Sequence, residues 1–381
     1  MILGIDASNI REGGGLTHLK EILLNANPEK HGFKKVVVWS SQKTLDKLPD
    51  FPWLLKVNNK WLNQSFIVSF LYQSLFISKD VRKRKCDLLF VPGGTFLGSF
   101  RHIISMSQNM LPFEKEELNR FPKWTSRLKF KLLKITQSYT FKKSEGIIFL
   151  TDYAKSYITN SIHLESRKTT VIPHGIKKTF VNEPKVQKEI QFYTENTPFR
   201  FLYVSIVTEY KHQWNVAKAI LRLRNDGYFI TLDLVGGYTD EALQKLNTVL
   251  AEDNKKIITY KGLIPYEELS TIYKNADGFI FASTCENMPI ILIEAMTAGL
   301  PVASSEKQPM PEILKESAFY FKATDTDNIY ECLKKYLQDP GKRKVNAEET
   351  FHKASRYTWE DCSDRTFTYL TKKIQENADT R

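Results

Sequence analysis

The chain has 381 residues, of which 42% are apolar and 26% are charged. This composition excludes a disordered chain, and the length is sufficient for two hydrophobic cores. The formal net charge of +12 favours an anionic partner, such as a nucleic acid, an anionic lipid or a phosphate-bearing substrate, but it does not choose among them.

The first residues of the chain lack the basic and apolar regions of a signal peptide, and no run of about 18 apolar residues predicts a membrane span. The four cysteines are scattered and form no C-x-x-C pair. They suit a reducing cytoplasm and argue against a structural zinc site. The cysteines are Cys86, Cys285, Cys332 and Cys362.

Short β-rich runs recur in the first half of the chain. Most are continuously apolar, as parallel strands buried on both faces are. Helix-compatible segments separate most of them, so they predict a doubly wound parallel sheet. The predicted strands are residues 2–6, 36–40, 88–92, 102–107, 146–151 and 169–172.

Three consecutive glycines, Gly13, Gly14 and Gly15, follow the first predicted strand and its loop. They do not form the G-x-G-x-x-G pattern of a nicotinamide-binding turn. Two interpretations stay open at this point: a plain flexible loop, and a loop that approaches a ligand.

Residues 123–143 combine seven Lys or Arg with Trp124 and several aliphatic residues. This segment is either a basic amphipathic helix that lies on anionic lipid or an ordinary half-buried helix with a solvated basic face. The run 79–85 adds local positive charge. A nucleic-acid-binding module is the non-enzymatic alternative, although no recognised binding motif accompanies these runs.

The stretch 177–198 is polar, contains two prolines and has no apolar period, so we interpret it as a linker region. A second series of β-rich runs follows, again with helix-compatible segments between them. Two such series predict two doubly wound α/β domains, whose ligands bind outside the carboxyl ends of the strands. The second series is residues 200–206, 230–235, 257–260, 278–283, 301–304 and 318–321.

The most informative segment is residues 281–304, which predicts a strand, a tight loop, a short helix and a strand. Pro289 suits the first turn of the helix and Asn287 is placed to cap it. Gly299 and Pro301 end the helix. The loop therefore lies at a helix N-terminus, where backbone N–H groups and the helix dipole form an anion site.

Two carboxylates flank this helix N-terminus. Glu286 lies in the loop, and Glu294, eight positions later, lies within an apolar run. A carboxylate buried in such a run needs a partner. A Lys or Arg is one candidate partner for Glu294, and the two hydroxyls of a ribose are another.

The pattern of Glu286, seven residues, Glu294 and then Ala-Met-Thr-Ala-Gly-Leu-Pro-Val resembles the signature of the retaining glycosyltransferases of family 4. That family has the GT-B fold, in which two Rossmann-like doubly wound domains face each other across a cleft. The resemblance implies that Glu286 contacts hydroxyls of the transferred sugar and that Glu294 binds the ribose of the donor. It also implies that the loop between them holds the diphosphate, through Asn287, Met288, Pro289 and Ile290.

The resemblance covers most of the chain and implies further site residues. Residues 201–213 resemble the first strand and loop of the family's C-terminal domain, where Lys211 would bind the donor phosphates. Residues 260–265 resemble the loop that borders the base, which assigns Leu263 to the donor site. Gly14 and Gly15 would approach the diphosphate and the acceptor.

The same resemblance sets the domain organisation. Residues 1–176 would form the N-terminal, acceptor-side domain, and residues 177–359 the C-terminal, donor-side domain. The segment around Trp359 resembles the family's terminal segment, so a C-terminal helix at about 360–381 would return to the first domain.

Two positions depart from the family pattern. Ser205 and Ile206 stand where Gly-Arg is common, so one phosphate-site cation is missing, and Arg222 and His212 are candidates to replace it. In the first domain Gln108 stands where many members have a His near the transferred sugar. Gln cannot be a general base, but in this family the donor's own phosphate is thought to assist the acceptor hydroxyl.

We therefore look for sugar or acceptor contacts at Gln108 and Asn109. No D-x-D motif lies on a suitable loop, so we expect no metal and no cofactor. The helix N-terminus and Lys211 would neutralise the diphosphate instead.

These features predict a retaining, metal-independent glycosyltransferase. It would move a sugar from a UDP- or GDP-sugar to a hydroxyl of a glycan or lipid-linked glycan in cell-surface polysaccharide synthesis, such as that of O-antigen or capsule. The expected location is the cytoplasm, with attachment at the inner face of the membrane. A sugar-nucleotide epimerase of the same fold is the enzymatic alternative, although the sequence offers no clear acid or base for it.

Overall fold

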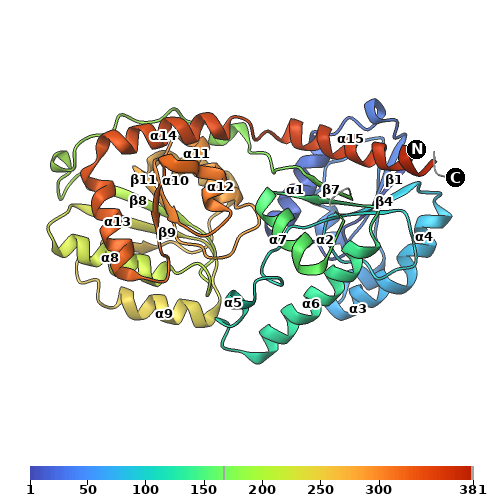
Figure 1. The fold of residues 1–381 in the computed structure, drawn as a ribbon, viewed down its shortest axis with the longest axis horizontal. Coiled ribbons are helices and arrows are strands. Elements are labelled where there is room, and N and C mark those ends of the chain that lie inside the picture. The colour runs from blue at the N-terminus through green and yellow to red at the C-terminus, as the bar shows by residue number, and fades with distance from the viewer. Residues whose placement is uncertain (166–167, 379–381) are drawn as a thin grey trace. The chain divides into compact units, whose positions relative to one another are not determined.

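The computed structural model describes residues 1–165 and 168–378. The chain forms two compact units (Figure 1). The first unit comprises Met1–Leu118, Pro122–Gly175 and Tyr357–Arg381, and the second comprises Asn119–Phe121 and Ile176–Arg356. Each unit is built around one parallel sheet with helices on both faces, which confirms the predicted fold class.

The sheet of the first unit has seven strands in the order β3-β2-β1-β4-β5-β6-β7, and every pairing is parallel. The central strands are buried on both faces, which explains their continuous apolar sequences. The strands are β1 (Ile2–Asp6), β2 (Lys35–Trp39), β3 (Leu54–Val57), β4 (Leu88–Val91), β5 (Ile103–Met106), β6 (Gly146–Phe149) and β7 (Thr169–Val171).

Six of these strands match the first predicted series to within two residues at each end, but β3 was not predicted. Its sequence, Leu-Leu-Lys-Val, lacks alternation, and β3 lies at the edge of the sheet where all four residues are only partly buried. Neither a continuous buried run nor an amphipathic pattern marks such a strand.

The helices of the first unit include a nearly continuous helical segment from Phe66 to Lys83, which contains one π-helical turn, η3. The elements are α1 (Gly13–Leu24), α2 (Gln42–Leu45), α3 (Phe66–Tyr72), η3 (Gln73–Ile77), α4 (Ser78–Lys83), α5 (Lys115–Leu118), α6 (Trp124–Lys143), α7 (Asp152–Ile162) and α15 (Trp359–Ala378).

The C-terminal helix α15 packs on the first unit, although it follows the second unit in sequence (Figure 1). Ser363 Oγ donates to the backbone oxygen of Ile22 at 2.8 Å, and Thr371 Oγ1 donates to that of His31 at 2.9 Å. The turn before α15 is equally close, because a Cβ on Gly175 would lie 2.2 Å from the backbone nitrogen of Trp359. Only glycine fits at that position.

The sheet of the second unit has six strands in the order β10-β9-β8-β11-β12-β13, again all parallel. The strands are β8 (Phe199–Val204), β9 (Ile230–Val235), β10 (Ile258–Tyr260), β11 (Gly278–Phe281), β12 (Val302–Ser305) and β13 (Phe319–Phe321). The helices are α8 (Gln213–Asn225), α9 (Asp240–Leu250), α10 (Tyr266–Asn275), α11 (Ile290–Thr297), α12 (Met310–Leu314), α13 (Thr326–Gln338) and α14 (Pro340–Ala354).

The stretch 177–198 is not a free linker, which corrects our interpretation of its sequence. Phe180 is 1% exposed and packs against the rings of Tyr266 and Tyr273. The amide of Asn182 donates to the backbone oxygen of Thr297 at 3.1 Å. The stretch lacks an apolar period because it covers the second unit as irregular chain and short 3₁₀ turns.

None of the helices in the described part of the chain is both long enough and apolar enough to cross a membrane.

Candidate functional site

The second sheet changes direction between β8 and β11. These two strands are neighbours, while the strands that follow each of them in sequence are added on opposite sides. In doubly wound sheets, ligands bind outside the carboxyl ends of the strands at such a switch point. Lys211 lies in the segment after β8, and Glu286 lies in the loop after β11.

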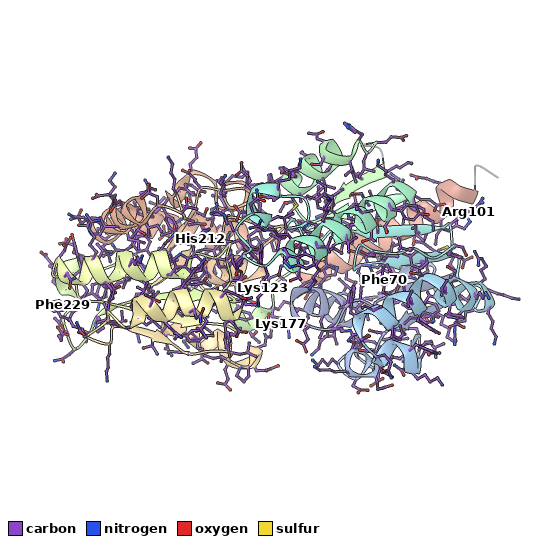
Figure 2. All side chains as sticks on the ribbon, turned by 90° about the horizontal axis from the view of Figure 1, so that it is seen from below. Phe70, Arg101, Lys123, Lys177, His212 and Phe229 are labelled. Atoms are coloured by element: carbon purple, nitrogen blue, oxygen red, sulfur yellow. The ribbon has the colours of Figure 1, made fainter. Side chains whose placement is uncertain are left out.

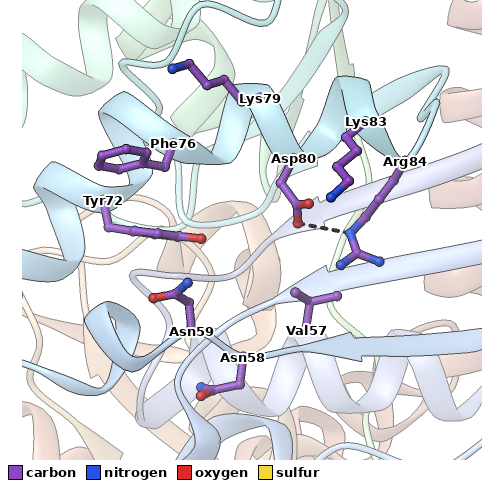
Figure 3. A pocket seen from close by; sticks show the side chains of 9 residues that line it. All are labelled: Val57, Asn58, Asn59, Tyr72, Phe76, Lys79, Asp80, Lys83 and Arg84. Carbon is purple, nitrogen blue, oxygen red and sulfur yellow. Dashed lines mark hydrogen bonds and ion pairs between the residues drawn. The ribbon is translucent and has the colours of Figure 1, made fainter.

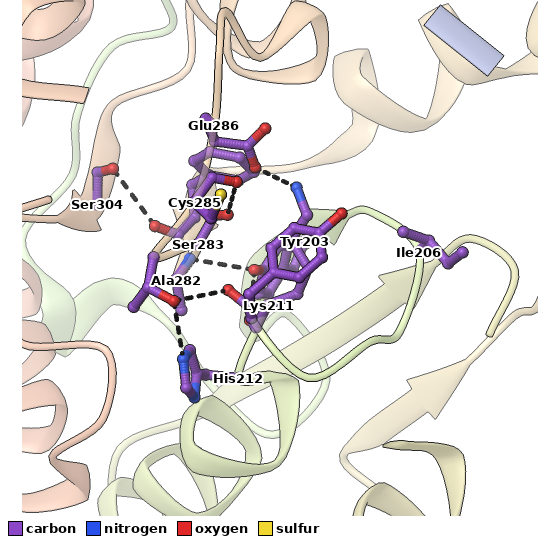
Figure 4. Close-up of polar contacts among 12 residues, drawn as sticks. Tyr203, Ile206, Lys211, His212, Ala282, Ser283, Cys285, Glu286 and Ser304 are labelled. Atoms are coloured by element: carbon purple, nitrogen blue, oxygen red, sulfur yellow. Dashed lines mark hydrogen bonds and ion pairs between the residues drawn. The ribbon is translucent and has the colours of Figure 1, made fainter. Parts of the chain in front are cut away.

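Lys211 and Glu286 form an ion pair at this switch point (Figure 4). Their side chains are only 6% and 14% exposed. The ammonium group of Lys211 also lies 4.9 Å from the ring centroid of Phe281 and 5.4 Å from that of Tyr210. A cation held this way has lost most of its water, so its field on a bound anion is weakly screened.

The backbone around Lys211 is fixed from both strands (Figure 4). The buried Tyr203 hydroxyl donates to the carbonyl oxygen of Lys211 at 2.6 Å and accepts from the amide of Ala282 at 3.2 Å. The amide of Thr284 donates to the carbonyl oxygen of Tyr210 at 2.9 Å. Burial, with a smaller contribution from the Glu286 carboxylate, raises the pKa of Tyr203 well above its usual value, so this hydroxyl remains a donor.

The helix after the loop, α11, begins at Ile290, one residue later than predicted. Pro289, and not Asn287, occupies the N-cap position, and its side chain makes no capping hydrogen bond. The expectation that Asn287 caps this helix is therefore wrong. Asn287 and Met288 are 5% and 6% exposed. The first two amides of α11 have no acceptor within the helix, as at any helix start, whereas the amide of Leu292 donates to the carbonyl oxygen of Pro289 at 3.1 Å.

Glu294 lies on α11 and is 1% exposed. Its partners are hydroxyls rather than a Lys or Arg: Tyr266 donates to Oε1 and Tyr273 to Oε2, both at 3.0 Å. Burial raises the pKa of Glu294 to about 7, although these hydrogen bonds and Lys177 act in the opposite direction. The carboxylate therefore already has neutral hydroxyl partners of the kind that a ribose would also supply.

Sequence reasoning missed Tyr266 and Tyr273. They are seven residues apart on α10, which is two helical turns, so they share one face. A pair of tyrosines at that spacing ahead of a strand was visible in the sequence, but nothing in the sequence indicated which carboxylate they meet.

Neither candidate for the missing phosphate-site cation fits that role. The Arg222 guanidinium pairs with Asp327 at 2.6 Å and lies 3.9 Å from the ring centroid of Tyr330, near the opposite end of α8 from Lys211. His212 is next to the site and approaches Thr284 Oγ1 at 3.2 Å. Burial lowers its pKa to about 4, so the ring is neutral at physiological pH.

The loops after β8, β9 and β10 are joined at the same edge of the sheet. The amide of Gly236 donates to the carbonyl oxygen of Gly262 at 2.8 Å, and Tyr260 Oη donates to that of Gly236 at 2.8 Å. Gly236 has a φ of 144°, and a Cβ there would lie 2.1 Å from the backbone oxygen of Ser205. Leu263, in the next position after Gly262, is 83% exposed.

The other predicted site residues lie in the first unit. Gly13, Gly14 and Gly15 form the first turn of α1, so the expected open loop is wrong, whereas the approach of Gly14 and Gly15 to a ligand stays a prediction. Gln108 Nε2 donates to the carbonyl oxygen of Pro92 at 3.0 Å. A Cβ on Gly15 would lie 3.5 Å from Gln108 Oε1, so the structure brings these two predicted positions together.

Asn109 Oδ1 accepts from the amide of Leu111 at 3.0 Å, and the residue lines a cavity described below.

A basic cavity of about 340 Å³ lies elsewhere in the first unit, between the end of β3 and the helices η3 and α4 (Figure 3). Asp80 Oδ2 accepts from Arg84 Nε at 2.9 Å and from Trp39 Nε1 at 2.7 Å. Lys79 and Lys83 also line it, so positive charge exceeds negative. None of the predicted site residues lies here.

Within residues 1–165 and 168–378, no group of three His, Cys, Asp or Glu side chains is arranged to hold a metal ion.

Comparison with known proteins shows which family a part of the chain matches and which fold the chain has. Residues 186–353 match the model of the family "Glycosyl transferases group 1". The O-antigen chain mannosyltransferase B of Escherichia coli is 28% identical to this chain over 139 residues, which are 36% of each protein. The chain spans between 23% and 36% of the length of three curated relatives that it matches.

Solved structures match over the whole chain. Sucrose-phosphate synthase from Thermosynechococcus elongatus aligns with a TM-score of 0.75 at 15% identity, covering 99% of this chain and 100% of that one. HepE from Anabaena, solved in complex with UDP-glucose, aligns with a TM-score of 0.69 at 15% identity over 100% of both chains. These likenesses establish the fold.

Proposed function

We propose that this chain, which belongs to the glycosyl transferases group 1 family through residues 186–353 and has the GT-B fold, is a retaining glycosyltransferase. It moves a sugar from a nucleotide-sugar donor to a hydroxyl of a glycan or lipid-linked glycan acceptor. Cell-surface polysaccharide synthesis is the proposed setting, supported by the relative that acts on an O-antigen chain.

The observation that carries this proposal is the grouping of charges at the switch point of the second sheet. A desolvated Lys211–Glu286 pair and the N-terminus of α11 follow neighbouring strands, and Glu294 lies on that same helix. One cation and one helix N-terminus suit a diphosphate. The two carboxylates suit sugar and ribose hydroxyls, which are hydrogen-bond donors.

The difficult step of such a transfer is departure of the nucleoside diphosphate. Negative charge grows on the diphosphate as the glycosidic bond breaks, and the Lys211 ammonium group and the loop amides before and within α11 would stabilise it. Glu286 would accept hydrogen bonds from the transferred sugar. Because the ion pair with Lys211 fixes the Glu286 carboxylate in the free protein, that carboxylate is already oriented when the sugar binds.

Glu294 would anchor the ribose. Its two tyrosine partners fix the carboxylate and leave each oxygen with further lone pairs for ribose hydroxyls. The acceptor would be bound by the first unit, where Gly14, Gly15, Gln108 and Asn109 are the proposed contacts. In this scheme the diphosphate is neutralised by Lys211 and backbone amides, so the reaction needs no metal.

The proposal is tested with a panel of UDP- and GDP-sugars, by measuring nucleoside diphosphate release in the presence of excess EDTA. We expect one donor to be hydrolysed slowly without an acceptor and the chelator to have no effect. The variant Glu294→Ala loses charge-assisted hydrogen bonds worth about 1.5–3 kcal/mol each, so nucleoside diphosphate affinity in calorimetry falls at least tenfold.

Glu312→Ala, on α12 of the same unit, is the control and retains wild-type affinity. If no nucleotide sugar is bound or hydrolysed, the proposed activity is wrong. If affinity is unchanged in Glu294→Ala while the donor still binds, Glu294 is removed from the site. Turnover that requires added Mg²⁺ or Mn²⁺ contradicts the proposed stabilisation of the leaving group.

A further inference from the structure

The first sheet has its own switch point, between the neighbouring strands β1 and β4. Asn9, which follows β1, donates through Nδ2 to the carbonyl oxygen of Gly93, which follows β4, at 3.1 Å. A cavity of about 530 Å³ opens beside this contact and extends between α3 and α6. Its volume lies in the range of small-molecule sites, and its place in the sheet is where ligands of this fold class bind.

The inner end of the cavity is polar and incompletely hydrogen-bonded. Gln73, in the π-helical turn, donates through Nε2 to Asp6 Oδ2 at 2.7 Å and to the carbonyl oxygen of Thr95 at 2.9 Å. By contrast, three buried atoms on residues that line the cavity have no hydrogen-bond partner among the described residues. They are Asn9 Oδ1, Thr95 Oγ1 and Gln137 Oε1.

Thr95 and Gln137 are each only 4% exposed, so leaving these atoms without partners costs stability. Two of the three atoms are amide oxygens, which require donors. Hydroxyl groups of a sugar supply donors, and they can also accept from the Thr95 hydroxyl. The inner end therefore fits a hydroxylated head group.

The outer part of the cavity is apolar. Phe66 and Phe70 contribute one wall from α3, and Leu132 and Leu133 contribute the other from α6, with Lys129 beside them. Phe70 is labelled in Figure 2. Phe66 and Leu132 are also 59% and 54% exposed, so the walls continue onto the outer surface.

That outer surface carries two apolar stripes. Ile67, Leu71 and Leu75 follow each other at four-residue spacing along α3 and η3 and are 69%, 52% and 61% exposed. Along α6 the stripe consists of Trp124, Leu128, Leu132, Ile135 and Tyr139, which are 44–71% exposed. Exposed apolar stripes beside a cavity, one of them on the Lys- and Arg-rich helix α6, match a hydrocarbon chain with an anionic surface around it.

We propose that this cavity takes a single glycolipid, with its hydroxylated head against Asn9, Thr95 and Gln137 and its hydrocarbon chain leaving between Phe66 and Leu132. This inference rests on the proposed function, because it names the chemical class of the acceptor. The chain of the lipid leads to the two apolar stripes, so the acceptor is delivered from a bilayer on which those stripes rest.

The probes are hexyl, heptyl and octyl glucoside at concentrations where they are monomeric. Free glucose and octanol are tested separately, as the head group and the hydrocarbon chain of octyl glucoside. Binding is measured by calorimetry on the full chain. We expect dissociation constants that fall about threefold for each added methylene, because each one buries further apolar surface. Glucose and octanol bind far more weakly than octyl glucoside.

Four variants locate the site. Leu133→Trp fills the cavity and abolishes octyl glucoside binding, whereas Ile135→Trp on the outer stripe of the same helix does not. Leu132→Ser weakens binding at least threefold, and its matched control Ile135→Ser leaves it unchanged. Both of these side chains are more than half exposed, so neither change endangers the fold.

Gln137→Leu weakens glucoside binding without lowering the melting temperature, because it removes a buried oxygen that has no partner in the free protein.

UDP binding is measured on the same proteins and separates the two proposals, because every cavity residue lies in the first unit. The glycolipid site alone is overturned if UDP still binds but glucoside affinity does not depend on the length of the hydrocarbon chain. It is also overturned if UDP still binds and the changes at positions 132 and 135 weaken glucoside binding equally. If the wild type binds neither UDP nor GDP, the donor function is overturned.

Discussion

Lys211 illustrates how one residue combines a structural role with a proposed catalytic one. Its side chain is 6% exposed, yet Glu286 and the faces of two aromatic rings keep the ammonium group satisfied in the free protein. Desolvation of such a buried ion pair costs free energy that the mutual attraction of the two charges need not repay. The proposed use of the Lys211 charge is stabilisation of the leaving diphosphate.

We predict that Lys211→Ala lowers kcat by about two orders of magnitude or more, in line with loss of one preorganised stabilising group, while the Michaelis constant changes much less. Initial-rate kinetics on the donor selected from the panel measure this. Lys218→Ala, an exposed neighbour on α8, is the control and keeps wild-type kinetics. Wild-type turnover in Lys211→Ala would assign the role to another cation.

Glu294 carries a second prediction because burial raises its pKa from 4.5 to about 7. The unfolded chain releases this proton near pH 4.5 and the folded chain releases it near pH 7, so the contribution of the protonated carboxyl to stability is present below about pH 4.5. It is lost as the pH rises to about 7. The loss amounts to roughly 3 kcal/mol for a shift of this size.

Chemical unfolding of the wild type and of Glu294→Gln at pH 5 and pH 8 tests this. The wild type should lose roughly 2–3 kcal/mol more than the variant between these values, because Gln does not titrate. Equal pH dependence of the two proteins would show that the carboxyl ionises normally in the fold.

The sequence indicates that Lys211, Glu286 and Glu294 belong to one region of the fold but not how their side chains are paired. Glu294 stood out because a carboxylate in an apolar run needs a partner, and that argument was sound. Its partners, Tyr266 and Tyr273, come from a different helix, and only the packing of α10 on α11 selects them. The same limit explains why Arg222 was a plausible cation in the sequence and is paired with Asp327 in the fold.

The helix α11 shows what sequence can establish at the level of elements. Gly299 and Pro301 marked its end, and the structure closes it there: the amide of Gly299 bonds to the carbonyl of Met296 and the amide of Leu300 to that of Ala295. This is the double hydrogen bond that ends a helix on a left-handed residue, and Gly299 has a φ of 64°.

We predict that Gly299→Ala destabilises the protein by about 2 kcal/mol or more. The left-handed backbone strains any residue with a Cβ, and a Cβ here would lie 2.6–2.8 Å from the backbone of Asn182 and Pro184. Because that backbone belongs to the chain covering α11, the start of the helix and the donor site should also shift.

Melting temperature and UDP affinity measure the two effects of this change. Gly227→Ala is the matched control, since Gly227 also has a positive φ, of 94°, but no atom lies within 4 Å of a Cβ there. Its cost should be limited to backbone strain, with UDP affinity unchanged. If both variants reduce stability equally, the close approach at Gly299 has no energetic role.

Elements with strong periodicity were predictable, and those determined by their neighbours were not. Helix α11 was found to within one residue at its start because apolar and turn signals agree there. The edge strand β3 was missed because it is defined by its hydrogen bonds to one neighbouring strand, β2, and not by a pattern in its own sequence. The first turn of α1 was missed because three glycines are poor helix formers, and the chain adopts a helix there only through packing of the residues that follow.

At the scale of the whole molecule, two parallel sheets with the same order of strands explain why chemistry gathers where it does. Each sheet has its first strand beside its fourth, so each unit has one switch point at the carboxyl ends of its strands. The second unit places a buried ion pair there, and the first unit places a polar-ended apolar cavity. This division suits an anionic donor and an amphiphilic acceptor.

The last prediction concerns attachment to a membrane. The sequence left open whether residues 123–143 form a lipid-binding helix, and the structure leaves the apolar stripe of α6 exposed to solvent. Each Lys or Arg near an anionic surface contributes roughly 1 kcal/mol, and salt screens this within a Debye length. We therefore predict co-sedimentation with phosphatidylglycerol vesicles at low salt, less at high salt and none with phosphatidylcholine.

Replacing Lys129, Lys131 and Lys134 by Glu should weaken vesicle binding at least tenfold at an unchanged melting temperature. The control replaces Lys218, Lys255 and Lys274, exposed residues of the second unit, by Glu. Because both triple variants change the net charge equally, identical losses would show that total charge, rather than α6, holds the protein on the lipid.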